Sequence, residues 1–472
     1  MNYQRPPTYS LQYGSFHPGG PPPIPRGVDD SPVGRVLAWI VILVSVAALV
    51  WSNARESKLA PAAAPTTATR PGTQLQFIGK YVVGAHAVTA KTNPNATSAT
   101  TMVAQLDGSA ESPVDKLAVV AVVGELEGKS AALARLDGLA KTLPDRLKPQ
   151  AEAMRTIYTT GPDALSNEQR AELKHSLGWF GDLALVFGRP ENHPQRAKVL
   201  EAAGRSFWVI IGFLGIGFLA GAVGLALCIY FIVKIGGGTL VRNYRASPGG
   251  GGVFLEAFAI YIGGITAANY AAGMLPHVLQ KSISAHIALM IGPTILAIAW
   301  PLIRGANSTA WRFGIGWNTG QGALREMAIG LVGYLAGLPV LFVGFLITAV
   351  LIKLSGAHPT HPIDHMLGVS PAMTFIVFML ASVYAPITEE TMFRGAFFHA
   401  LRARHRWLLS AVVSSFIFAA VHPQGWTVIP VLMSIAIVFA GIREWRGTIF
   451  SSAAAHCLHN TVVLLLATLV LQ

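Results

Sequence analysis

The chain has 472 residues, of which 52% are hydrophobic and only 12% are charged, and its mean hydropathy is +0.49. This composition excludes an ordinary soluble enzyme, because several apolar runs approach or exceed the roughly 20 residues that a helix needs to cross a bilayer. The runs are continuous and do not alternate, which favours membrane helices over a barrel. We therefore expect an all-α, polytopic membrane helical bundle.

The formal net charge of +12 does not by itself indicate nucleic acid. In a membrane protein, excess Lys and Arg set the topology and attract anionic headgroups. The sequence carries no nucleic-acid-binding motif, so we expect the lipid bilayer as partner and no nucleic acid. The two cysteines, Cys228 and Cys457, lie inside apolar runs and exclude a disulfide framework. We interpret them as small core residues.

Four segments precede the C-terminal part of the chain. Residues 1–34 are rich in Pro and Gly, which predicts a disordered tail. Residues 35–52 hold the first span, at 36–52, which fits a signal anchor better than a cleaved signal peptide because a long segment precedes it. Residues 53–205 begin with a low-complexity Ala/Pro/Thr stretch and then predict a small, mostly helical extramembrane domain. Residues 206–370 predict the N-terminal part of a transmembrane bundle.

Two helix starts in the extramembrane segment have clear signatures. Ser112 is expected to cap a helix that has Pro113 at its first position. Ser166 and Gln169 predict a capping box. No catalytic constellation is found in this segment, and its role is left open.

Nine membrane spans are expected in all, with the catalytic membrane core in residues 371–472. After the span at 36–52, the other eight are predicted at 207–235, 253–275, 283–303, 326–352, 371–386, 407–422, 427–442 and 448–471. Glu256 and Glu326 lie near span starts and are interpreted as interfacial.

Lys and Arg are concentrated in alternate short loops, and the opposite loops hold little beyond Lys281 and Lys353. If the basic loops are cytoplasmic, the N-terminus is cytoplasmic and residues 53–205 lie outside. In a bacterium this would be the inner membrane. The basic loops carry Lys234, Arg242, Arg245, Arg304, Arg312, Arg325, Arg402, Arg404, Arg406, Arg443 and Arg446.

The stretch "ITEETMFRG" places two adjacent carboxylates directly after an apolar run. We expect Pro386 to end or kink the preceding span, and Thr388 to cap a new helix with the two glutamates in its first turn. Glu390 and Arg394 are four residues apart and can pair, while Glu389 lies about 100° away and is free to act. A plain interfacial ion pair would produce the same pattern.

Polar residues inside two later spans extend this set. His422 ends one span, and His456 and Asn460 share a face of the last one. A single intramembrane His is usually a helix–helix hydrogen bond, but such residues on three helices of one bundle are functional candidates. A carboxylate and an imidazole can deprotonate a water, and a second His and an amide can donate to an oxyanion. These residues predict amide hydrolysis without a covalent nucleophile.

A metal site is the alternative interpretation of the same residues. Glu389, His422 and His456 could hold a divalent metal such as zinc with an open position for water. The sequence spacing does not distinguish a metal site from a metal-free site, because these ligands would come from separate helices. The stretch "AHPTHPIDH" offers a second metal candidate, although a Pro-broken loop of this kind is usually a polar connector. Its residues are His358, His361, Asp364 and His365.

The motifs Glu-Glu-x-x-x-Arg, Phe-x-x-x-His and His-x-x-x-Asn occur in this order in "EETMFRG", "FAAVH" and "HCLHN". This part of the chain resembles the CAAX protease and bacteriocin-processing family of intramembrane endopeptidases, whose best-known branch is the prenyl-protein CAAX endopeptidase. The similarity is strong over the C-terminal core, weak over "WRFGIGWNTGQGALREMAIGLVG", and absent from the first 205 residues.

The resemblance implies an eight-helix-type fold whose site opens to the cytoplasmic side within the bilayer. It implies that Glu389 and His422 activate water, that His456 and Asn460 stabilise the oxyanion, and that Arg394 orders the glutamate pair. The substrate would be a membrane-embedded or lipidated protein. Family members are often called metalloproteases. We favour a glutamate-dependent mechanism and leave the metal open.

Two other functions fit a bundle of this kind. A catalytically silent scaffold or immunity-type protein would keep the fold without turnover. A proton-coupled transporter could use a Glu/His site, but the sequence shows no inverted repeat and no paired broken helices. Oligomeric state and the identity of the substrate are not predicted.

Overall fold

The computed structural model describes residues 31–59, 70–92, 99–246, 251–276, 283–357 and 370–471, and the following applies to these residues. The chain divides into two compact units. One, called the helical domain here, consists mainly of Glu56–Leu219. The other, called the membrane unit, combines the first helix with Ala220–Pro362 and Phe375–Val462. The predicted tail up to residue 30 and the cluster around His358 lie outside the described residues.

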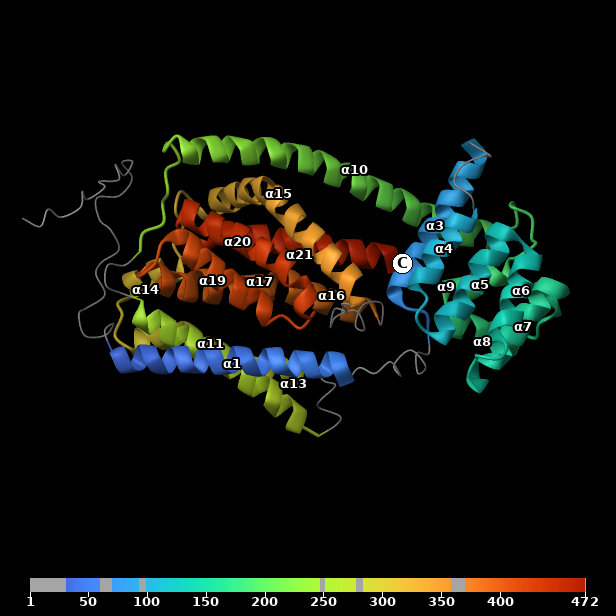
Figure 1. The fold of residues 1–472 in the computed structure, drawn as a ribbon, viewed down its shortest axis with the longest axis horizontal. Helices are drawn as coiled ribbons and strands as arrows, with labels where there is room; N and C mark the ends of the chain where they lie inside the picture. The colour runs from blue at the N-terminus through green and yellow to red at the C-terminus, as the bar shows by residue number, and fades with distance from the viewer. Residues whose placement is uncertain are drawn as a thin grey trace, which may run out of the picture. The chain divides into compact units, whose positions relative to one another are not determined.

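The helical domain packs short helices around one apolar helix. Residues 117–123 of α5 are all at most 1% exposed, as expected for a helix that is apolar on every side. The helices, coloured blue to green in Figure 1, are α3 (Thr73–Thr92), α4 (Ala99–Ser109), α5 (Pro113–Glu127), α6 (Lys129–Leu139), α7 (Lys148–Thr159), α8 (Asn167–Leu177) and α9 (Trp179–Leu185).

Both predicted caps in this domain are confirmed. The Ser112 side chain accepts a hydrogen bond from the Asp115 backbone N–H, and the Asp115 side chain accepts one from the Ser112 N–H. Ser166 and Gln169 form the same reciprocal pair at the start of α8. Each box satisfies two backbone donors that a helix start would otherwise leave free.

A buried lysine of α3 lies close to the first part of α10 (Pro194–Gly236). The two helices are close, since a Cβ on Gly84 would lie 2.3 Å from the backbone oxygen of Ala203. Lys80 is only 3% exposed there. Its burial, with the positive charge of Arg205 nearby, lowers the pKa of the Lys80 amine below the usual 10.5. The folded state therefore holds this proton less tightly than the unfolded state.

Replacing Lys80 by Met is expected to raise the free energy of unfolding by roughly 1 kcal/mol at pH 7, because a buried charge is removed. Since the folded-state pKa is depressed, the unfavourable contribution is fully present at neutral pH and disappears as pH rises toward 10.5. Thermal unfolding at pH 7 and pH 10 should show a gain that shrinks at the higher pH. Lys129→Met, at an exposed position of the same domain, is the control.

The membrane unit is built from long apolar helices, and the protein is a multi-pass integral membrane protein. Seven described helices are long and apolar enough to cross a membrane, and the other two predicted spans contain the shorter apolar helices Ile287–Ile303 and Trp407–Ala420. The elements are α1 (Pro32–Leu59), α11 (Gly252–Met274), α13 (Ile283–Ile303), α14 (Ser308–Ile315), α15 (Ala323–Ser355), α19 (Trp407–Ala420), α20 (Ile429–Arg446) and α21 (Ile449–Leu471).

Helix α10 is longer than a span requires. Its 43 residues correspond to about 65 Å, roughly twice the hydrocarbon thickness of a bilayer. The polar first part packs in the helical domain, and the apolar part from Phe207 onward matches the predicted span at 207–235. One continuous helix therefore contains both the segment that packs in the helical domain and the predicted span.

Two sets of contacts organise the membrane unit. In Figure 1, α1 runs alongside α11, and Ile42 of α1 is fully buried in one core with Phe258 of α11. On the other side, α15 packs closely on α20 and α21. A Cβ on Gly330 would come within 2.0 Å of Ser451 O, and one on Gly337 within 2.4 Å of a Val438 methyl. Small residues of this kind allow membrane helices to approach closely.

The segment with the two glutamates is one continuous helix, so the predicted cap at Thr388 is wrong. Residues 371–402 run through α16 (Pro371–Met379), π-helix η3 (Leu380–Tyr384), α17 (Ala385–Glu389), π-helix η4 (Glu390–Phe397) and α18 (Phe398–Arg402). Pro386 directly follows the wide turn of η3, where Ala385 N–H bonds to Leu380 O, five residues back. A π-turn at this point lets the helix continue through the proline.

Candidate active site

The core of the site is a buried ion pair within η4. Arg394 Nη1 lies 3.1 Å from Glu390 Oε1, and both side chains are at most 1% exposed. This confirms the pairing that the four-residue spacing predicts. Arg394 Nη2 also donates to Ala436 O at 3.2 Å, and its guanidinium lies 4.6 Å from the Phe418 ring and 5.4 Å from the Phe439 ring. The cation is thus held by a carboxylate, a carbonyl and two aromatic faces.

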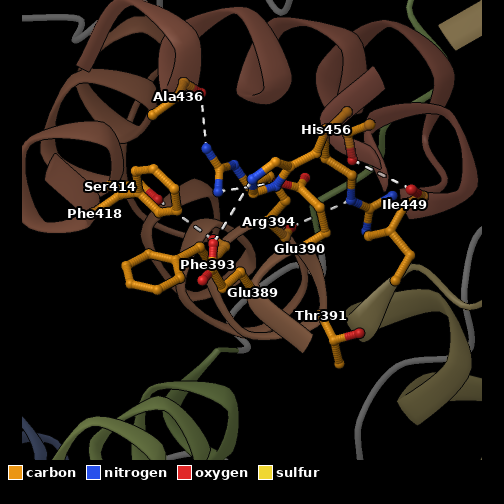
Figure 2. A network of polar contacts seen from close by, with 12 residues as sticks. Glu389, Glu390, Thr391, Phe393, Arg394, Ser414, Phe418, Ala436, Ile449 and His456 are labelled. Carbon is orange, nitrogen blue, oxygen red and sulfur yellow. Dashed lines mark hydrogen bonds and ion pairs between the residues drawn. The ribbon is translucent and has the colours of Figure 1, made fainter. Parts of the chain in front are cut away.

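His456 of α21 faces both glutamates. Its Nδ1 lies 3.2 Å from Glu390 Oε1, and its Nε2 lies 3.8 Å from Glu389 Oε2. The ring stacks on Phe439 with centroids 4.7 Å apart. Figure 2 shows His456 together with the two glutamates and Arg394. Glu390 accepts a hydrogen bond from Nδ1–H of His456. The other ring nitrogen, Nε2, is directed toward Glu389.

The two glutamates differ in environment. Glu390 is fully buried and has Arg394 and His456 as partners, whereas the Glu389 side chain is 23% exposed and makes the longer, 3.8 Å contact to His456. Adjacent residues on a helix point in different directions, so one carboxylate enters the protein core while the other faces outward. Glu389 is therefore the carboxylate that a water or substrate can reach.

Asn460 lies one turn after His456 on α21, and one of its two amide N–H groups is already hydrogen-bonded. Its Nδ2 donates to Ala381 O at 2.7 Å. In the π-pattern of η3, the carbonyl of Ala381 would bond to the N–H of the residue at 386, which is proline and has none. Asn460 thus supplies the hydrogen bond that Pro386 removes, and it ties α21 to the helix that carries Glu389.

His422 lies at the end of α19 and reaches the cluster indirectly. Its Nδ1 contacts Phe418 O at 2.5 Å, and its ring lies 4.4 Å from that of Phe418. Asn53 of α1 donates to the His422 backbone oxygen at 3.3 Å. Among the described residues, His422 forms no hydrogen bond or ion pair with Glu389. The structure therefore brings Glu389, Glu390, Arg394 and His456 together, and links His422 and Asn460 to them through Phe418 and Ala381.

The expected metal ligands do not converge. In the part of the chain that the structure describes, no three His, Cys, Asp or Glu side chains form a group that could hold a metal ion. Glu389 and His456 are close, but His422 is not joined to them. Among the described residues, the expected ligands do not fit the predicted metal site.

Two buried arginines lie near the site. From the sequence, both were interpreted only as basic loop residues that set the membrane topology. Arg443 is 0% exposed and donates through Nε to Arg394 O and through Nη2 to Gly314 O, both at 3.3 Å. Arg446 makes two 2.8 Å hydrogen bonds to Glu326, which is 1% exposed. Glu326, in the first turn of α15, is thus buried and neutralised by Arg446, and its interfacial position stays a prediction.

Comparison with known proteins supports the similarity noted in the sequence. Residues 371–462 match the family model described as "Type II CAAX prenyl endopeptidase Rce1-like". This segment belongs to the Rce1-like family. It contains all six candidate residues, namely Glu389, Glu390, Arg394, His422, His456 and Asn460.

A curated relative gives no further information on activity. An "Uncharacterized 24.3 kDa protein" of Escherichia coli is 31% identical over 108 residues. The matched region is 22% of this chain and 46% of that relative, so the chain spans less than half of the relative's length. No solved structure matches the chain significantly.

Proposed function

We propose that the protein is an intramembrane endopeptidase that hydrolyses a peptide bond of a membrane-embedded or lipidated protein. The observation that carries this proposal is the pair of adjacent glutamates in unequal environments, both facing His456. Pairs of ionisable groups separated in this way are typical of acid–base sites. The Rce1-like family of residues 371–462 supports a peptidase of the CAAX type.

In the proposed reaction, Glu389 accepts a proton from a water molecule, and the hydroxide adds to the scissile carbonyl carbon. His422, whose Nδ1 is held by Phe418 O, presents its Nε2 as the second group that orients this water. His456 Nε2, next to Glu389, is placed to stabilise the oxyanion when it also carries a proton, because the Nδ1–H of the ring is already donated to Glu390. The C–N bond then breaks as the proton passes from Glu389 to the leaving amine nitrogen, which yields an acid and an amine.

The buried residues hold this arrangement in place. The Glu390–Arg394 pair fixes η4, and Glu390 also orients the His456 ring. Preorganised groups of this kind lower the barrier because they need not rearrange during the reaction. Glu390 and Arg394 are therefore positioning residues, and Glu389 is the proposed base.

Peptide-terminus proteomics on native membranes tests the proposal. Membranes carrying the native chain are compared with membranes carrying Glu389→Gln at equal abundance. New peptide termini that disappear in the variant would identify both the activity and its substrates. Identical terminus profiles from two folded proteins would reject the peptidase and favour the catalytically silent scaffold.

Asn460→Ala is expected to lower turnover by about 10²–10³-fold if its second N–H donates to the oxyanion, and to destabilise the fold by about 1–3 kcal/mol by freeing Ala381 O. Pro386→Ala separates the two roles, because it restores a backbone N–H for that carbonyl. The double variant should recover thermal stability. Turnover that recovers as well would show that Asn460 acts only by positioning the helix.

A further inference from the structure

A cavity lies at the ends of three membrane helices, away from the candidate active site. It has a volume of about 280 Å³ and is lined by residues of α1, α11, α18 and the turn that follows α18. The candidate spans begin at Pro32 and Gly252 and end at Arg402. The cavity therefore opens where these helices reach the membrane surface.

The lining of this cavity is cationic and apolar. Arg35, Arg404 and His405 supply the charged or ionisable groups, while Val36, Trp39 and Leu401 supply apolar walls. None of the described residues that line it is acidic. The neighbouring carboxylate, Glu256, is engaged by Arg304 Nε at 3.0 Å and by Trp300 Nε1 at 2.8 Å.

The apolar side of the cavity continues onto the outer face of α1. Val36 lines the cavity and is 59% exposed, and Val33, Leu37 and Ile40 on the same helix are 51–67% exposed. In a span, such a face contacts acyl chains. A molecule in the cavity would thus have cations at one end and the hydrocarbon region at the other. An anionic amphiphile has this form, and a small soluble anion does not.

We propose that this cavity binds the headgroup of an anionic phospholipid. Arg404 contacts its phosphate, and Val36 and Trp39 contact the start of its acyl chains. The loops on this side carry most of the short-loop arginines, which by the positive-inside rule places the site in the cytoplasmic leaflet, where anionic lipids attract basic residues.

The proposal can be tested by lipid binding, independently of proteolysis. The purified full chain in a nonionic detergent is titrated with short-chain phosphatidylglycerol, short-chain phosphatidylcholine, glycerol phosphate and inorganic phosphate. The native chain should bind phosphatidylglycerol most tightly. Arg404→Glu should weaken that binding roughly tenfold or more, because one cation near a membrane surface contributes about 1 kcal/mol and the change reverses its charge.

Arg406→Glu is the matched control, because Arg406 is exposed in the same turn but does not line the cavity. It should weaken binding less than about threefold. Equal losses in the two variants would show general attraction to surface charge and overturn the proposal. Binding of glycerol phosphate or inorganic phosphate as tight as that of phosphatidylglycerol would indicate a soluble-anion site, and absence of any binding would also overturn it.

If Arg404→Glu fails to fold, two variants that leave the net charge unchanged test the same proposal. Val36→Trp fills the cavity without a change in charge and should weaken phosphatidylglycerol binding. Val33→Trp, on the same helix but outside the cavity, should not. Unchanged affinity in a folded Val36→Trp protein would overturn the proposal.

Discussion

Glu389→Gln is expected to lower turnover by about 10²–10⁴-fold and to change the free energy of unfolding by less than roughly 0.5 kcal/mol. Gln keeps the shape of the side chain but cannot accept a proton from water. Stability should change little, because Glu389 is 23% exposed and its ionic contact among the described residues is the long, 3.8 Å approach to His456. The measurements are cleavage of a substrate found by terminus proteomics and thermal unfolding of the purified protein.

Glu390→Gln provides the matched control, since it makes the same chemical change one residue along. Here stability should fall as well as turnover, by about 3–5 kcal/mol, because Arg394 keeps its charge inside the protein without its carboxylate partner. Equal loss of stability in the two variants would contradict the assignment of different roles. Full turnover in a folded Glu389→Gln protein would remove Glu389 as the base.

The central contact of the candidate site could be predicted from the sequence because the information for it is local. Glu390 and Arg394 are one helical turn apart, so a spacing rule predicts their contact, and the structure confirms it. The two capping boxes at Ser112 and Ser166 follow from equally local rules. The apolar runs predicted the positions of the membrane helices for the same reason.

Features that depend on partners far along the chain were missed. Arg443 and Arg446 look like topology charges at the end of a span. In the structure, Arg443 donates to Arg394 O, and Arg446 binds Glu326, which is 120 residues away in the sequence. The expected cap at Thr388 failed because η3 widens the helix before Pro386 and Asn460 bonds the carbonyl that the proline leaves. A proline in a span together with an Asn on another helix is the signal that could have indicated this.

Arg394→Met tests whether the ion pair acts through stability or through orientation of the site. The variant leaves the Glu390 carboxylate buried without its cation, so the free energy of unfolding should fall by about 3–5 kcal/mol. Turnover should fall as well, because Glu390 orients His456. Arg394→Lys keeps the charge but cannot reproduce the planar guanidinium contacts with Phe418 and Ala436, and should lose less.

The double variant Glu390→Gln/Arg394→Met separates these effects. Both buried charges are then absent, so stability should recover to within roughly 1–2 kcal/mol of the native chain, well above either single variant. Turnover should stay low, because the substituted side chain no longer offers His456 a carboxylate. Thermal unfolding and cleavage measured on the four proteins of this cycle decide the point. If turnover recovers together with stability, the ion pair only supports the fold, and His456 is oriented by its stacking on Phe439 instead.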